Sequence, residues 1–193
     1  MGLDHTLIDV QDSALVVIDV QAAFLDKLPA ADQRTLLDRI CWLIRVAACL
    51  DVPLVVTAED IANLGSVHAQ VADALPPGTP VYDKMTFGLA AEPEIMAALE
   101  RTGRKTALLV GLETDVCVAH SAIGLLQAGY RVVAVADATA SPGTGHAFGL
   151  ERMRGAGALV LGFKGLYYEW QRTVERADRF HARHAQLVGA WPD

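Results

Sequence analysis

The sequence predicts an α/β protein: a doubly wound, mostly parallel six-stranded sheet with helices on both faces. Short runs rich in β-branched residues alternate along the 193-residue chain with segments whose apolar residues recur at helical spacing. This alternation is typical of parallel βαβ units, whose right-handed crossovers place helices on both sides of a sheet. The length suits one sizeable core, so we expect residues 1–193 to form a single domain.

The first half of the chain predicts three strands and three helices. Its strand-like runs are short and β-branched, and one of its helical patterns stops at the turn signal Pro76-Pro-Gly78. The expected strands lie at 15–20, 54–57 and 80–82, and the expected helices lie at about 32–50, 66–75 and 92–101.

The second half continues the alternation and ends in a long helix. Gly129 is a typical stop after a helix, because glycine readily adopts the left-handed conformation found there. The expected strands lie at 106–110, 131–135 and 158–161, and helices are expected at 116–128, in the segment through Met153, and continuously from 167 to 188.

Composition limits the classes of partner. A hydrophobic fraction of 52%, with 20% charged residues, suggests a sheet buried on both faces and a homo-oligomer. The net charge of −7 and the pI near 5.3 oppose binding to nucleic acid, which requires a concentrated basic face. No apolar run is long enough to span a bilayer and residues 1–6 do not resemble a signal peptide, so we expect a cytoplasmic protein away from membranes.

The three cysteines have no spacing that indicates a disulfide framework or a zinc site. Cys41 and Cys49 lie in a strongly apolar helical segment and are expected to be structural. Cys117 instead follows a predicted strand at the start of a predicted helix, where unpaired amides and the helix dipole can lower the pKa of a thiol. Free cysteine is also commonly buried as a small hydrophobe, so both interpretations stay open on position alone.

Three chemically complementary side chains lie at or beyond the ends of three of the predicted strands. Asp19 lies at the end of the first strand, Lys84 just beyond the third and Cys117 after the fourth. Ligands of doubly wound sheets bind outside the carboxyl ends of the strands, so this topology can bring all three to one edge. Each has an ordinary structural explanation by itself, but a carboxylate, an ammonium and a thiol together form a coherent catalytic set.

The same residues resemble those of the isochorismatase-like cysteine hydrolases, a family that includes nicotinamidases and N-carbamoylsarcosine amidohydrolases. The resemblance spans nearly the whole chain. It is carried by Val17-Ile-Asp-Val-Gln-Ala-Ala-Phe24, Asp83-Lys-Met-Thr-Phe-Gly88, Gly111-Leu-Glu-Thr-Asp-Val-Cys-Val118 and Ala136-Asp-Ala138.

The resemblance implies a reaction and its residues. Cys117 would be the nucleophile, Asp19 the base and Lys84 their positive partner, and the amides of Glu113 and Cys117 would form the oxyanion hole. In the family the peptide bond that corresponds to Leu112–Glu113 is cis. The presence of a thiol favours hydrolysis of a C–N bond, other than a peptide bond, in a small amide or carbamoyl compound through a thioester.

The chain departs from the nicotinamidase pattern where those enzymes bind a metal. Glu59, Asp60 and His68 offer ligand atoms after the second predicted strand, but their spacing differs from the Asp-x-His pattern of nicotinamidases. We therefore expect no metal and no cofactor, and the chain is most similar to the metal-free branch of the family. Its partner is expected to be a small-molecule substrate.

Several neighbouring residues have more than one interpretation. Phe24 and Phe87 flank the predicted Asp and Lys and are expected to line the substrate pocket, although such aromatics are often plain core. His120 follows Cys117 by about one helical turn, where packing is commoner than catalysis. Thr114 is expected to cap the helix and Asp115 to add first-turn charge.

Two other classes of function are compatible with this type of fold. A non-catalytic binding or scaffold protein could keep the fold without the chemistry. A nucleotide-binding protein could share the topology, but no G-x-G-x-x-G follows the first strand and no phosphate-binding G-x-x-x-x-G-K-[ST] is present.

Overall fold

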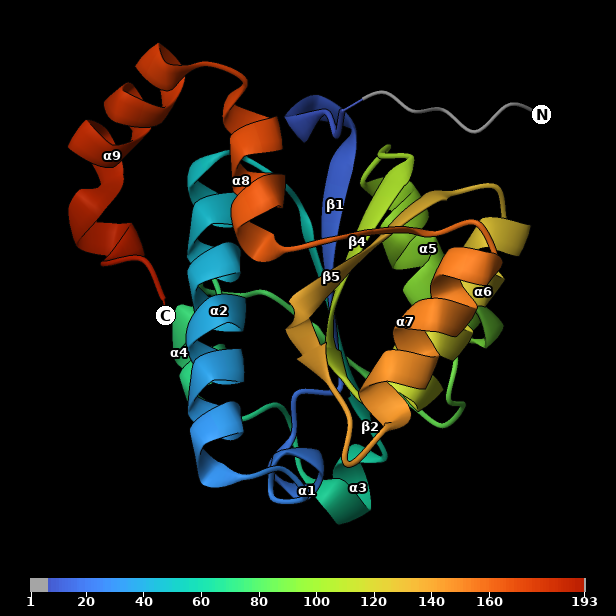
Figure 1. Cartoon of the computed structure of the whole chain (residues 1–193). Coiled ribbons are helices and arrows are strands. Elements are labelled where there is room, and N and C mark those ends of the chain that lie inside the picture. The colour runs from blue at the N-terminus through green and yellow to red at the C-terminus, as the bar shows by residue number, and fades with distance from the viewer. Residues whose placement is uncertain (1–6, 193) are drawn as a thin grey trace.

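The fold is built on one sheet of six parallel strands, seen near the centre of Figure 1. It was obtained as a computed structural model, which describes residues 7–192. The strand order is β3-β2-β1-β4-β5-β6, and every neighbouring pair is parallel. This order confirms the predicted doubly wound α/β class. The strands are β1 Ser13–Ile18, β2 Leu54–Glu59, β3 Val81–Lys84, β4 Thr106–Leu112, β5 Arg131–Ala140 and β6 Leu159–Leu161.

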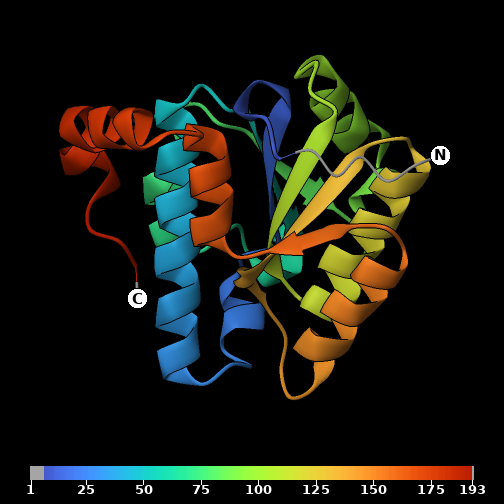
Figure 2. The same cartoon turned by 45° about the horizontal axis from the view of Figure 1, so that its top comes forward.

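Helices cover both faces of this sheet (Figures 1 and 2). Residues 7–192 also form three shorter turns: η1 Val10–Asp12 before β1, η2 Leu89–Ala91 between β3 and α5, and the π-helical η3 Thr114–Val118 between β4 and α6. The helices are α1 Ala22–Leu25, α2 Ala30–Cys49, α3 Ile61–Leu64, α4 Ala69–Ala74, α5 Pro93–Arg101, α6 Ala119–Gln127, α7 Gly145–Gly155, α8 Phe163–Gln171 and α9 Val174–Val188.

The sheet separates two apolar cores because successive side chains of a strand point to opposite faces. Leu15 and Val17 of β1 belong to the core that includes residues of α2, α8 and α9. Val16 and Ile18 of the same strand belong to the other core, which includes residues of α5, α6 and α7. All six residues of β1 are buried, as expected for a strand covered on both sides.

The two central strands bring the predicted catalytic segments together. β1 pairs with β2 on one side and with β4 on the other, so the loops after β1 and β4 leave the sheet side by side. Gly111 allows this close approach: it adopts φ 122°, and a Cβ there would meet Ile18 O at 1.9 Å. The carboxyl edge at the centre of the sheet is therefore where a site can form.

Several predicted elements differ from the structure in their bounds. The expected helix at 66–75 is the shorter α4, Ala69–Ala74, and the short helix α3 lies before it at Ile61–Leu64, where no helix was expected. The expected strand at 131–135 continues to Ala140. The single terminal helix is divided into α8 and α9, because Arg172 adopts φ 66° and the Thr173 side chain caps α9 by accepting from Arg176 N.

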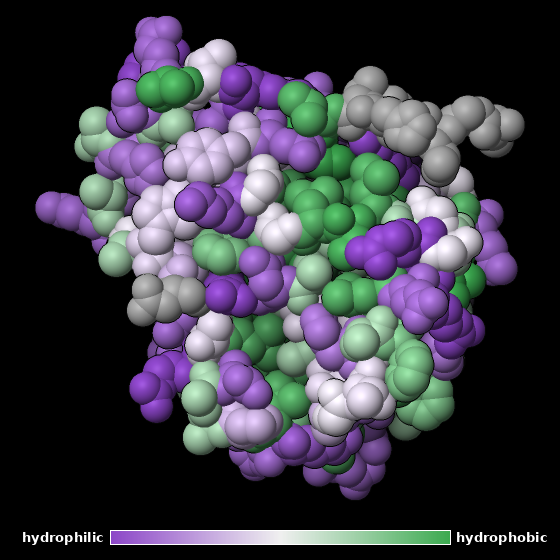
Figure 3. Space-filling view, viewed as in Figure 1, coloured by the Kyte–Doolittle hydropathy of each residue, from purple (hydrophilic) through white to green (hydrophobic). Residues whose placement is uncertain are grey.

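The surface in the view of Figure 1 mixes polar areas with an apolar area near its centre, between α8 and α7 (Figure 3). The three residues of β6, at the edge of the sheet, are each partly exposed. Within residues 7–192, every helix is too short or too polar to cross a bilayer. Residues 1–6, on which the signal-peptide expectation rests, lie outside the described part of the chain.

Candidate active site

Asp19 is the first residue after β1 and has no exposed side-chain surface. Its backbone takes the left-handed conformation, φ 47°, which aspartate tolerates better than most residues. Oδ1 accepts a hydrogen bond of 2.8 Å from Thr57 Oγ1. Burial raises the pKa of Asp19, and the nearby Lys84 only partly opposes that effect.

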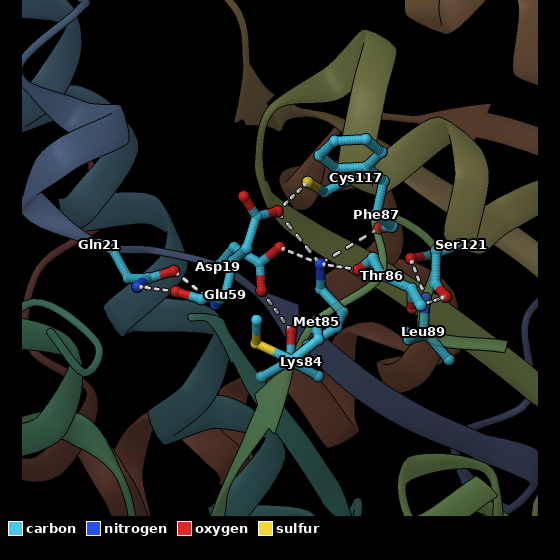
Figure 4. A network of polar contacts seen from close by, with 12 residues as sticks. Asp19, Gln21, Glu59, Lys84, Met85, Thr86, Phe87, Leu89, Cys117 and Ser121 are labelled. Atoms are coloured by element: carbon cyan, nitrogen blue, oxygen red, sulfur yellow. Dashed lines mark hydrogen bonds and ion pairs between the residues drawn. The ribbon is translucent and has the colours of Figure 1, made fainter. Parts of the chain in front are cut away.

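Lys84 ends β3 and is also completely buried. Its Nζ lies 2.9 Å from Asp19 Oδ2 and donates to the carbonyl oxygens of Thr86 and Phe87 at 2.6 and 3.3 Å. Burial alone would lower the pKa of Lys84, but Asp19, together with Cys117 and other neighbours, raises it above its ordinary value. The Lys84 ammonium is therefore held in one position by the Asp19 carboxylate and two backbone carbonyl oxygens (Figure 4).

Cys117 lies in the π-helical turn η3 rather than in the first turn of an α-helix, and it is 2% exposed. The amides of a helix start can lower the pKa of a thiol, but the contacts of the folded site act in the opposite direction. Burial raises the pKa of Cys117 well above its ordinary value, and the negative charge of Asp19 adds to the increase, whereas Lys84 opposes it. The resting group is a thiol held beside carboxylates.

Glu59 is a site residue that the sequence analysis considered only as a metal ligand. It ends β2, and its Oε2 accepts a hydrogen bond of 3.2 Å from Cys117 Sγ. The same oxygen lies 3.4 Å from Lys84 Nζ. Its place in the sequence could have indicated this role, because Glu59 lies just beyond the strand predicted at 54–57, at the same sheet edge as Asp19 and Lys84.

The loop that leads to the thiol has the backbone feature that the family resemblance implied: the Leu112–Glu113 peptide bond is cis. Thr114 was expected to cap the following helix, and this was wrong. Its Oγ1 instead lies 2.9 Å from His146 Nδ1, and the turn begins without a side-chain cap. Asp115 does lie in the first turn, where its Oδ1 accepts a 2.6 Å hydrogen bond from Ser141 Oγ.

The aromatic residues predicted for the pocket have different surroundings. Phe87 is 56% exposed, and Figure 4 shows its ring beside the Cys117 thiol. Phe24 is buried in the core that includes α2, with the ammonium of Lys27 at 4.7 Å from its ring centroid. His120 is exposed, and its ring packs against that of Phe87 at 6.1 Å between centroids.

Within residues 7–192, the donors that come together closely enough for a metal ion are Asp19, Glu59 and Cys117, whose ligand atoms lie within 4.8 Å of one another. Lys84 already provides a positive charge in direct contact with both carboxylates. A cation placed among these donors would be repelled by this ammonium, so the arrangement does not favour a metal.

The other two residues weighed as metal ligands make different contacts. The Asp60 carboxylate accepts hydrogen bonds from Asn63 Nδ2, and His68 Nδ1 accepts from Gln70 N at the start of α4. These two side chains therefore stabilise the local turns on which they lie. The geometry instead provides a nucleophile, two proton acceptors and a fixed cation at one sheet edge, which suits covalent catalysis.

Comparison with known proteins gives an independent view of the whole chain. A family model described as the isochorismatase domain matches residues 13–164. The secreted isochorismatase effector Isc1 of Phytophthora sojae is 34% identical to this chain, over 81% of this chain and 76% of its own length.

Solved structures are similar over nearly the full length. The MAR1 ribonuclease from Caenorhabditis elegans superposes with a TM-score of 0.85 at 25% identity, covering 97% of this chain and 95% of its own. The Escherichia coli YcaC protein, described as an octameric hydrolase of unknown specificity, superposes with a TM-score of 0.84 at 20% identity, with coverages of 97% and 95%.

Proposed function

The chain belongs to the isochorismatase family, whose members are hydrolases, and from that membership we propose that it is a cysteine hydrolase. Its substrate is a small amide or carbamoyl compound, whose C–N bond is cleaved through a thioester on Cys117. The observation that carries the proposal is the convergence of the Cys117 thiol with Asp19 and Lys84 at one edge of the sheet.

The first half of the reaction forms the thioester. Asp19 takes the thiol proton as Sγ attacks the carbonyl carbon, because burial has raised the pKa of Asp19 and made it a stronger base. The raised pKa of Cys117 means that this transfer accompanies attack rather than preceding it. The amides of Glu113 and Cys117 hold the oxyanion, and when the C–N bond breaks Asp19 returns the proton to the departing nitrogen.

The second half restores the enzyme. Water attacks the thioester carbon and Asp19 takes a proton from the water. The C–S bond then breaks as Asp19 passes this proton to Cys117 Sγ, which releases the acid and restores the thiol. Lys84 stays protonated throughout and offsets the negative charge that moves between Asp19 and Cys117.

The expected partners are a small-molecule substrate and further copies of the chain. The name of the ribonuclease relative does not extend to this chain in our proposal, because its net charge of −7 is unfavourable for a phosphate backbone. A homo-oligomer is supported by the mean hydropathy of +0.29 and by the octameric YcaC relative. Sedimentation velocity tests this: a particle of a single 20.6 kDa chain at micromolar concentration would contradict it.

The experiment for the proposed activity measures ammonia release from a panel of small primary amides and carbamoyl compounds. Wild type is expected to turn over at least one of them and, after acid quenching, to carry the acyl group on Cys117 in the mass spectrum. Cys117→Ala removes the nucleophile and is expected to lower the rate by about a thousandfold or more. Cys41→Ala, which removes a buried thiol outside the site, is the matched control. Full turnover by Cys117→Ala would refute the proposal.

A non-catalytic member of the fold is the second candidate, and the 2% exposure and raised pKa of Cys117 favour it. Alkylation by iodoacetamide separates the two. A catalytic thiol is expected to react faster than Cys41 or Cys49 and to slow in Asp19→Asn. Labelling of Cys117 no faster than that of the other two thiols, and unchanged in Asp19→Asn, would favour the non-catalytic member.

A further inference from the structure

The carboxylate of Glu59 lies directly beside the proposed nucleophile. Its Oε2 is 3.2 Å from Cys117 Sγ and 3.4 Å from Lys84 Nζ (Figure 4). Its side chain keeps 18% exposure, so one part faces the thiol while another can meet a ligand. The mechanism proposed above does not use this group.

Glu59 is fixed in place by Gln21, a fully buried residue just after β1. Gln21 Oε1 accepts from Glu59 N at 2.7 Å, and Gln21 Nε2 donates to Glu59 O at 2.8 Å and to Gly65 O at 2.7 Å. Both backbone polar groups of Glu59 are thus held by one side chain from the loop that follows the neighbouring strand β1. Such fixed geometry is what a recognition group requires.

The charges at this site favour some ligands over others. Asp19 and Glu59 provide two carboxylates against the single ammonium of Lys84. Four oxygens lie within 3.4 Å of Lys84 Nζ, which exceeds the three hydrogens that an ammonium can donate. Lys27 Nζ is likewise paired with Glu113 Oε1 at 2.8 Å. A substrate carboxylate would therefore meet repulsion without a free ammonium among these groups.

During the reaction, Glu59 loses the hydrogen-bond donor that it has in the resting enzyme. When the thiol proton moves to Asp19, Glu59 Oε2 loses the hydrogen bond from Cys117 and faces a developing negative charge at 3.2 Å. The nitrogen on the attacked carbon lies one bond beyond the new S–C bond, within reach of that oxygen. An N–H from this nitrogen can replace the lost donor.

We infer that Glu59 is a specificity-determining residue that accepts an N–H from the substrate nitrogen at the attacked carbon. The inference rests on the proposed function and names its substrate class: uncharged or cationic primary amides and carbamoyl compounds. Compounds with a carboxylate near the attacked carbon are rejected by the same oxygen. As the leaving nitrogen gains its proton and positive character, Glu59 stabilises it more strongly.

The first test compares two alkylating reagents that differ in charge, iodoacetamide and iodoacetate. The rate of Cys117 labelling by each reagent is measured by mass spectrometry, and the iodoacetamide rate is divided by the iodoacetate rate; uncharged N-acetylcysteine amide gives the intrinsic ratio. We expect this ratio in wild type to be about tenfold higher than for N-acetylcysteine amide, because the Glu59 carboxylate lies in contact with the thiol. Glu59→Gln keeps the shape, removes the charge and is expected to lose most of this excess.

The matched control is Asp60→Asn, which removes the same charge one residue further along. The Asp60 carboxylate is engaged by Asn63 Nδ2, so this variant is expected to keep the wild-type ratio. An equal ratio in wild type and Glu59→Gln, or a wild-type ratio equal to that of N-acetylcysteine amide, overturns the inference. The ratio is also taken near pH 10, where alkylation is faster, so that a slow thiol still gives a value.

The second test uses hydrolysis of butyramide and succinamate, which have the same carbon chain length and differ by a terminal carboxylate. The measured quantity is kcat/KM for butyramide divided by kcat/KM for succinamate. This ratio is expected to fall by about fivefold or more in Glu59→Gln and to stay unchanged in Asp60→Asn. The proposed function itself fails if neither compound is hydrolysed, or if Cys117→Ala hydrolyses them as fast as wild type. Failure of the Glu59 inference is a ratio that does not respond to the charge at residue 59.

Discussion

Asp19 and Lys84 place opposite charges 2.9 Å apart with no exposed surface on either side chain. Removing only the cation leaves a buried carboxylate without its partner, which is far more costly than losing a surface pair. Lys84→Met is therefore expected to lower the free energy of unfolding by about 3–5 kcal/mol, measured by urea denaturation.

The double variant Asp19→Asn/Lys84→Met tests this explanation, because it removes both charges and is expected to recover more than half of the loss. Lys27→Met is the matched control. It breaks the Lys27–Glu113 pair, in which the lysine is 47% exposed, and should cost less than about 1 kcal/mol. A loss in Lys84→Met no larger than that in Lys27→Met would show that the buried pair contributes little.

At the residue scale, the sequence predicts Asp19, Lys84 and Cys117 because each follows a strand that periodicity reveals. Glu59 obeys the same rule but was assigned to a loop, since the predicted strand stopped at Thr57. The pairing of Ala58 with Asp83 and of Glu59 with Lys84 extends β2 by two residues. This register depends on a strand more than 20 residues away along the chain, so local patterns could not show that β2 includes Glu59, although the place of Glu59 just beyond the predicted strand was visible.

The thiol illustrates a second limit at this scale. The local amides that can lower the pKa of Cys117 are visible in the sequence around it, whereas the burial and the Asp19 charge that raise its pKa come from the assembled sheet. Residue identity predicted the participants. Their protonation states depend on contacts between distant segments.

Among the elements, the break between α8 and α9 has a long-range cause. Arg172 donates from Nη2 to the carbonyl oxygens of Leu7 and Ile8, more than 160 residues earlier. Its backbone turns to φ 66° where a helix would continue, and Thr173 starts α9 in a new direction. The helical periodicity of the segment is genuine, but it does not reveal this interruption.

The packing of α7 against the turn that carries Cys117 leads to an element-scale prediction. A Cβ at Gly149 would lie 2.7 Å from Asp115 N and from the Thr114 carbonyl group, which are backbone atoms that cannot rotate away. Gly149→Ala is expected to push α7 from η3. Stability should fall by about 1–3 kcal/mol, and alkylation of Cys117 should slow by roughly tenfold as its alignment is lost.

Gly155→Ala, in the last turn of the same helix, is the control for this prediction. Nothing lies within 4 Å of a Cβ at Gly155, so the variant is expected to be as stable as wild type or slightly more stable. Thermal unfolding and mass-spectrometric labelling measure both effects. If Gly149→Ala behaved like Gly155→Ala in the two assays, α7 would not support the nucleophile turn.

For the whole molecule, the alternation of strands and helices was sufficient to predict six strands and a doubly wound sheet. Right-handed crossovers and helices on both faces leave few other arrangements for such a chain. The division into two apolar cores follows from the two-residue period of the strands. The sequence indicates that Cys41 is structural, but it does not show how far burial raises the pKa of Cys41, Cys117 and Tyr167, and these shifts determine how the stability of the molecule responds to pH.

The folded molecule holds several protons more tightly than the unfolded chain. Burial raises the pKa of Cys41 from 9.0 to about 11 and that of Tyr167 from 10.0 to about 12, and the pKa of Cys117 is also raised. Above about pH 9 the unfolded chain loses these protons while the folded chain keeps them. Because the folded state then binds more protons, its stability must fall as pH rises.

We therefore expect the urea midpoint of wild type to decrease steadily from about pH 9 to pH 11. Cys41→Ala removes one of the responsible groups, so its stability should fall less steeply over that range even though the lost side chain lowers stability at pH 7. Val46→Ala, in the same helix and fully buried, creates a cavity without removing a titratable group and should keep the wild-type slope. If stability fell equally steeply with pH in the three proteins, folding would not raise the pKa of Cys41, and the loss of stability at alkaline pH would arise from other groups.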